Sequence, residues 1–99
     1  MKILALEKEV PGVRDEAFTV ELLRREAARA WELYQAGSIR EMYFRSDRTE
    51  AVLLLECTSV AEAETILSSL PLVRSGLIAF ECIPLKPYDG FARLFSPTL

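Results

Sequence analysis

The chain contains two stretches with the same outline, each a strand-like run, a helix-like run and a second strand-like run. The first stretch extends from Lys2 to Phe44, and the second extends from Ala51 to Leu85. Two such units in 99 residues predict an α+β, ferredoxin-like βαββαβ fold. In this fold a four-stranded antiparallel sheet carries two helices on one of its faces.

The length, charge and ends of the chain limit its class. We expect a single domain over residues 1–99, with a core over 1–86 and a tail over 87–99. The net charge is -3 and basic residues are interleaved with acids, so we expect no nucleic-acid partner. The N-terminus MKILALEKEV carries charges where a signal peptide is apolar, and no apolar run is long enough to span a membrane. We therefore expect a cytoplasmic protein without a membrane partner.

The residue inventory excludes several kinds of chemistry. The sequence has no histidine and only two cysteines, so it lacks the residues for a His-ligated zinc site, an all-Cys zinc site or a Ser-His or Cys-His pair. It has no Gly-rich phosphate loop, and we expect neither a cofactor nor a metal. Cys57 and Cys82 fall in strands that the first strand should separate by roughly 9–10 Å, too far for a disulfide. Both thiols are predicted to be reduced and to face the helices.

Alternate residues of a strand point to opposite faces of the sheet. The strand residues therefore divide into two sets, called here the first and the second parity. The first parity is wholly apolar and suits the face under the helices: Leu4, Leu6, Met42, Phe44, Leu53, Leu55, Cys57, Ile78, Phe80 and Cys82. The second parity mixes aliphatic and charged residues: Ile3, Ala5, Glu7, Ile39, Glu41, Tyr43, Arg45, Val52, Leu54, Glu56, Leu77, Ala79, Glu81 and Ile83. A solvated face should not carry so many aliphatic residues. We expect the sheet of a second copy to cover it, which gives a homodimeric α+β barrel that can assemble further.

Helical spacing and composition make two further predictions. A stripe at helical spacing, Leu23, Ala27, Ala30, Trp31 and Tyr34, should face the core, so we expect Trp31 to be a core residue. The segment after Pro84 is rich in proline and aromatic residues. We expect its aromatic side chains to pack on the dimer.

Three segments resemble the muconolactone isomerase-like family of the dimeric α+β barrel superfamily. They are EAARAWELYQAGSIREMYFR, ECTSVAEAETILSSLPL and LPLVRSGLIAFECIPLKP, and together they cover most of the chain. The resemblance implies a cofactor-independent enzyme that shifts a proton and a double bond in a lactone, inside a barrel-type dimer. This sequence departs from the family in having no histidine and a different C-terminal tail.

Candidate catalytic residues lie on the second sheet face. Carboxylates placed among aliphatic side chains have raised pKa values that suit proton transfer, which makes Glu81 and then Glu7 the candidate proton carriers. Tyr43 could donate a hydrogen bond to an enolate oxygen. Each acid could instead form an ion pair between subunits.

Arg45 and Glu56 are the candidate substrate-binding residues. Arg45 could hold a substrate carboxylate, although it also lies opposite Glu50, where a cross-strand ion pair is the simpler interpretation. Glu56 shares the same predicted face, near one end of the sheet.

Three functions remain open from the sequence. The first is a cofactor-independent isomerase-like enzyme that transfers a proton on a small lactone or acidic organic molecule in a pocket of the dimer barrel. The second is a non-catalytic module that binds a small molecule. The third is a structural oligomer whose inner face is filled by its own side chains.

Overall fold

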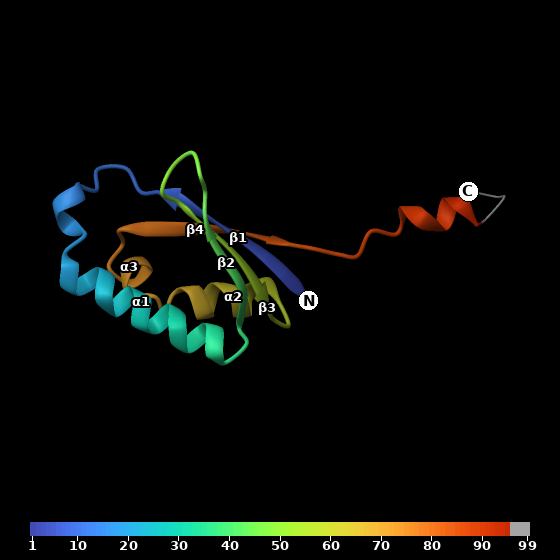
Figure 1. Cartoon of the computed structure of the whole chain (residues 1–99), viewed down its shortest axis with the longest axis horizontal. Helices are drawn as coiled ribbons and strands as arrows, with labels where there is room; N and C mark the ends of the chain where they lie inside the picture. The colour runs from blue at the N-terminus through green and yellow to red at the C-terminus, as the bar shows by residue number, and fades with distance from the viewer. Residues whose placement is uncertain (96–99) are drawn as a thin grey trace.

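The computed structural model describes residues 1–95 and shows a sheet with its main helices on one face (Figure 1). The elements in chain order are β1 (Lys2–Glu9), η1 (Asp15–Ala17), α1 (Val20–Gln35), β2 (Ile39–Phe44), β3 (Ala51–Glu56), α2 (Val60–Leu67), α3 (Pro71–Arg74), β4 (Ile78–Pro84) and η2 (Gly90–Leu94). The sheet is antiparallel with strand order β2-β3-β1-β4. The predicted fold class is confirmed. None of the helices between residues 1 and 95 has the length and apolar character needed to cross a membrane.

The helix ends follow local sequence signals. The hydroxyl of Thr19 accepts the Leu22 N–H at 3.2 Å and starts α1, and Gly37 adopts a φ of 82° just after that helix. The Ser59 hydroxyl accepts the Glu62 N–H at 3.1 Å and starts α2. The Glu62 carboxylate reaches back to the N–H of Thr58, the residue before Ser59.

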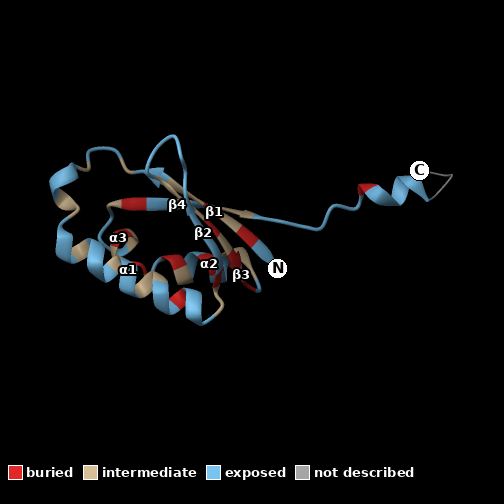
Figure 2. Cartoon of the chain, in the orientation of Figure 1, coloured by how far each residue is buried: buried red, intermediate tan, exposed pale blue. Residues whose placement is uncertain are grey.

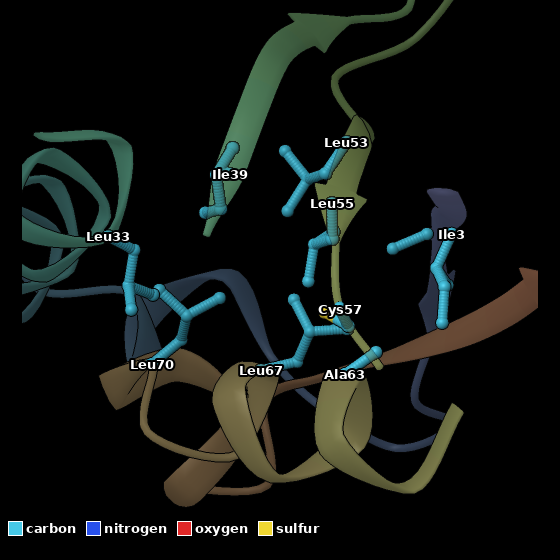
Figure 3. Packing of buried hydrophobic residues seen from close by; sticks show 10 residues of the cluster. Ile3, Leu33, Ile39, Leu53, Leu55, Cys57, Ala63, Leu67 and Leu70 are labelled. Atoms are coloured by element: carbon cyan, nitrogen blue, oxygen red, sulfur yellow. The ribbon is translucent and has the colours of Figure 1, made fainter. Parts of the chain in front are cut away.

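The core lies between the sheet and the helices (Figure 3). Its side chains come from all of these layers: Ile3, Ala5, Leu33, Ile39, Leu53, Leu55, Cys57, Ala63, Leu67 and Leu70. Leu55 is fully buried near the middle of this cluster, where residues from β2, β3 and α2 point toward one another. The helices therefore bury only one face of the sheet.

The structure corrects the predicted faces of β1. Ile3 pairs with Leu55 and Ala5 pairs with Leu53, so the side chains of Ile3, Ala5 and Glu7 lie on the helix side. Leu4 and Leu6 were predicted on that side and lie on the open face instead. The prediction failed because residues 3–6 of this strand are all apolar. Alternation cannot decide which residues face the helices when the residues of both sets are apolar.

A β-bulge corrects the predicted position of Ile39. The register between β2 and β3 shifts between Ile39 and Glu41, which places Arg40 as the extra residue. Ile39 is therefore fully buried on the helix side, the same side as Met42 and Phe44. Strict alternation had put Ile39 on the second face.

The predicted core stripe of α1 is also wrong in part. Leu33 is the buried residue of this helix, whereas Trp31 is 58% exposed and Leu23 and Tyr34 are also exposed. Trp31 is therefore not a core residue. The stripe borders a groove beside the sheet, and its apolar character reflects that groove and not a sealed core.

The prediction for the cysteines is confirmed within residues 1–95. Both thiols are free, Cys57 is buried, and Cys82 packs against the core cluster from the helix side of β4. Burial raises the pKa of both thiols.

The C-terminal segment runs away from the sheet and helices (Figure 1). The Leu85 N–H donates to the Lys2 carbonyl at 2.9 Å, and the chain beyond it is almost entirely exposed (Figure 2). The predicted tail extends to residue 99, and positions 96–99 lie outside the described residues. Packing of this tail on a dimer stays a prediction.

Two adjacent leucines on opposite faces test this arrangement. We expect Leu55→Ala to lower the free energy of unfolding by about 2–5 kcal/mol, because it leaves a cavity in a fully buried site. Leu54→Ala, on the open face, should cost less in dilute solution. Chemical denaturation followed by circular dichroism measures both, and equal losses would contradict the assignment of the faces.

Candidate functional site

A groove between α1 and the sheet forms a cavity of about 850 Å³. Its floor is made by β3 and β4 residues such as Leu53 and Phe80, and its walls are α1 and β2. A volume of this size is in the range of about 300–1,000 Å³ that is usual for small-molecule sites. The cavity is mostly apolar and contains a few polar side chains, as such sites generally do.

Glu7 enters this cavity from the end of β1. Its Oε1 atom accepts the backbone N–H of Ala51 at 2.9 Å, which holds the carboxylate against β3. Burial raises the pKa of Glu7, the hydrogen bond from Ala51 opposes this rise, and the charge of Glu50 adds to it. Glu7 is one of the predicted catalytic residues, and it lies on the helix side of the sheet instead of the open face.

Glu26 enters the same cavity from α1. Its Oε1 atom accepts the backbone N–H of Leu72 at 2.9 Å, so the carboxylate also fixes the start of α3. Burial raises the pKa of Glu26, the hydrogen bond from Leu72 lowers it, and the negative charge of Glu7 raises it further. The two carboxyl groups thus influence one another across the cavity.

This pair of acids has the properties of a proton-transfer site. Because each Oε1 is held by a backbone N–H, the orientation of both carboxyl groups is fixed. Over residues 1–95, the Oε2 atom of each has no hydrogen-bonding partner and can face a ligand. The negative charge of Glu7 favours the neutral form of Glu26.

Aromatic and basic side chains surround the opening of the cavity. Trp31 and Tyr34 stack on α1 with ring centroids 5.9 Å apart, and Met42 and Phe44 face them from β2. Arg40 also lines the cavity, and its Nε atom donates to the Gly37 carbonyl at 2.7 Å. We call this set of side chains the groove rim.

The structure does not bring the other two predicted catalytic residues together. Glu81 is on the open face of β4, 3.3 Å from the Lys8 ammonium, and does not line the cavity. The Tyr43 hydroxyl donates to Glu41 at 2.7 Å on the exposed edge strand β2, and this hydrogen bond raises the pKa of Tyr43. Tyr43 contributes to the wall of the cavity, but the structure does not bring it together with Glu81.

The predicted substrate-binding residues form local ion pairs. Two nitrogens of Arg45 donate to the Asp47 carboxylate at 2.9 and 2.6 Å, and this pairing lowers the pKa of Asp47. Glu50, the expected partner of Arg45, pairs with Arg48 instead. Glu56 accepts from the N-terminal ammonium at 2.6 Å, which lowers the pKa of Glu56. Neither Arg45 nor Glu56 lines the cavity.

Sequence reasoning missed Glu26, although a signal for it was present. Glu26 is four residues after Leu22 and seven before Leu33, so it shares the inward side of α1 with both. An acid at a core-facing helical position is unusual, and the structure half-buries it. Within residues 1–95, no group of acids and cysteines is arranged to hold a metal ion.

The raised pKa values of Glu7 and Glu26 predict a pH-dependent stability. Both values lie above the ordinary value of 4.5, so the folded chain binds protons more tightly than the unfolded chain. This contribution to stability is complete below pH 4.5 and is lost as the pH rises through the raised values. Urea unfolding at a series of pH values measures the free energy of unfolding. As the pH rises, this free energy should fall less in Glu7→Gln and Glu26→Gln than in the native chain. Identical pH slopes would contradict the burial of these acids.

Comparisons with known proteins agree with this fold. The chain resembles 5-chloro-2-hydroxyhydroquinone dehydrochlorinase from Burkholderia phenoliruptrix AC1100, solved with 2,5-dihydroxybenzoquinone, at a TM-score of 0.68 and 19% identity over 91% of this chain and 98% of that one. It also resembles a muconolactone isomerase, at a TM-score of 0.70 and 18% identity over 90% of this chain and 92% of that one. No curated protein sequence matches the chain.

A match to a protein-family model tests the family relationship that these structural similarities suggest. The model described as muconolactone delta-isomerase matches residues 4–90, which include most of β1, the other three strands, both main helices and the two acids of the cavity. This chain therefore belongs to the muconolactone delta-isomerase family.

Proposed function

We propose that this protein is a cofactor-independent enzyme that transfers a proton on a small lactone or acidic organic molecule bound in the cavity. The observation that carries the proposal is the pair Glu7 and Glu26, two half-buried acids with raised pKa values that line one apolar cavity. Family membership supports an isomerase or related activity on a small molecule.

The two acids can divide the chemistry between them. The ionised carboxylate removes a proton from a carbon next to a carbonyl group, and the electron pair of the broken C–H bond moves into an enolate. The neutral carboxyl donates a hydrogen bond to the enolate oxygen. Return of the proton to a different carbon shifts the double bond, and the reaction needs no oxidant, reductant or metal. The first of these steps is also a reasonable start for the loss of HCl named in the dehydrochlorinase.

The cavity also offers a group for substrate binding. Arg40 also lines it, and its guanidinium nitrogens beyond Nε can pair with a carboxylate of an acidic substrate. The rings of Trp31 and Tyr34 provide a flat apolar surface for a planar unsaturated ring.

We also propose that the protein works as a homodimer joined through the open sheet face. Leu4, Leu6, Leu54 and Ile83 are only partly covered there, and the helices lie on the other side of the sheet (Figure 1). Glu81 and Lys8 lie on the same face. In a dimer Glu81 would lie at the interface, where it is a second candidate for proton transfer or an ion pair.

Substitution of the acids tests the assignment of the catalytic site. We expect Glu7→Gln and Glu26→Gln each to lower kcat by about 10²–10⁴-fold, because each removes a general acid or base while keeping an oxygen that can accept the backbone N–H. The assay follows ultraviolet absorbance of a series of unsaturated lactones, beginning with muconolactone. Glu64→Gln, an exposed acid on α2, is the matched control and should keep full activity, and Glu81→Gln tests the second candidate. Loss of turnover in Glu81→Gln alone would move the reaction to the open face.

Light scattering at micromolar concentration tests the dimer. We expect a mass of at least twice 11.2 kDa, because the open face is too apolar to stay solvated. Leu4→Glu should weaken the association, since it places a charge in the centre of the open face. Ala28→Glu, on the exposed side of α1, is the control and should associate as the native chain does. A monomeric native protein would contradict the proposal.

A further inference from the structure

Two acids mark one end of the groove. The Glu7 carboxylate accepts the N–H of Ala51, the first residue of β3, and the Glu26 carboxylate accepts the N–H of Leu72. The charge of Glu7 raises the pKa of Glu26, so the two carboxyl groups lie near one another. Glu41, the third acid of the lining, accepts a tyrosine hydroxyl of its own strand and is not part of this pair.

The guanidinium of Arg40 marks the other end of the groove. After α1 the chain turns at Gly37 and returns as β2, whose first residue, Ile39, pairs with Leu55 near the end of β3 (Figure 1). The Arg40 Nε atom donates to the Gly37 carbonyl at 2.7 Å, which draws the guanidinium further from Ala51. Within residues 1–95, Arg40 is the one cation that lines the cavity.

Strand and helix geometry give similar separations of the two ends. On β3, Leu55 comes four residues after Ala51, a distance of about 13 Å at roughly 3.3 Å per residue. On α1, Tyr34 comes eight residues after Glu26, a distance of about 12 Å at 1.5 Å per residue. The Tyr34 carbonyl accepts the Gly37 N–H at 3.1 Å, so Tyr34 lies at the guanidinium end. With a hydrogen bond of about 2.9 Å at each end, roughly 7 Å or more separates the two polar groups of a molecule that reaches both.

The stretch between the two ends is apolar and flat. Met42 and Leu53 line it from the sheet, and Trp31 and Tyr34 line it from α1. The two rings stack within 23° of parallel, which gives a flat apolar surface. The cavity volume of about 850 Å³ is in the upper part of the range of about 300–1,000 Å³ that is usual for drug-sized ligands. This space suits a molecule larger than a single small ring.

We propose that the groove binds an extended planar acid with two fused rings, whose carboxylate lies at Arg40 and whose carbonyl or enol oxygen lies at Glu7 and Glu26. This assignment rests on the proposed function, since it takes the two acids as the reacting end. A molecule whose carboxylate is three bonds from its reacting carbon spans only about 4.5 Å, at about 1.5 Å per bond. Such a short acid reaches one end at a time, whereas two fused rings reach both.

Two isomers of a hydroxynaphthoic acid test the length of the ligand. In 6-hydroxy-2-naphthoic acid the hydroxyl and the carboxylate lie at opposite ends of the fused rings, whereas in 4-hydroxy-2-naphthoic acid both lie on the same ring. The isomers have the same apolar area, and the phenol imitates an enol. We expect titration calorimetry on the full chain at neutral pH to show about tenfold tighter binding of the 6-hydroxy isomer, because it alone makes both polar contacts. Equal affinities, or no binding of either isomer at millimolar concentration, would overturn the proposal.

Substitutions at the two ends test where each polar group of the ligand lies. Arg40→Gln removes the partner of the carboxylate, and Glu26→Gln puts an amide nitrogen, which cannot accept the phenol O–H, in the place of Oε2. We expect each substitution to weaken binding of the 6-hydroxy isomer about fivefold or more. Arg25→Gln, on the exposed side of α1, is the matched control and should keep the native affinity. Native affinity of the Arg40→Gln or the Glu26→Gln chain would contradict the placement of the ligand.

These binding measurements are separate from the proposed reaction, because they need no turnover. If Glu7→Gln and Glu26→Gln kept their kcat while the two isomers differed as expected, the proposed reaction would fail and the ligand assignment would stand. If the two isomers bound equally while Glu7→Gln lost turnover, the ligand assignment would fail and the proposed reaction would stand.

Discussion

Two short helices are too small to cover both faces of a four-stranded sheet. Most features of this protein follow from this incomplete coverage. α1 has 16 residues and α2 has 8, and both lie on one face of the sheet (Figure 1). Together they seal the centre of that face over Ile3, Leu53 and Leu55. Burial of apolar surface, at about 25 cal/mol per Å², stabilises this centre. It leaves the other face open and the groove beside α1 unsealed.

The unsealed groove is where the chain tolerates two acids on the core side of its fold. A carboxylate placed among apolar side chains lowers stability unless it is hydrogen-bonded. Glu7 and Glu26 each receive one backbone N–H, from Ala51 and Leu72, which offsets only part of the loss of hydration and leaves both pKa values raised. Local rules of folding are commonly broken at functional sites, and here the same groups that weaken the fold are the proposed proton carriers.

The exposure of the groove rim bears on the proposed chemistry. An open cavity admits water, which weakens the interaction between charged groups and a ligand, whereas a closed cavity strengthens it. A cover over Trp31 and Tyr34 would therefore raise the effect of Glu7 and Glu26 on a bound molecule.

The order of strands and helices was determined by the sequence itself, because it depends on local signals that residues carry wherever they lie. Thr19 and Ser59 start the two main helices, Gly37 ends the first, and the repeated strand-helix-strand pattern specifies the sheet. The absence of histidine likewise limited the available chemistry from the start.

Only the tertiary structure decided which side chains meet. Ile3 and Leu4 are equally apolar, so the face of β1 was settled by its register with β3, in which Ile3 pairs with Leu55. The bulge at Arg40 placed Ile39 in the core, and the packing of α1 through Leu33 left Trp31 outside it. Glu7 and Glu26 line one cavity although 19 positions separate them in the chain. Periodicity describes one strand or helix at a time, whereas a site is formed by the relative placement of several, and that placement depends on pairing and packing across the whole fold.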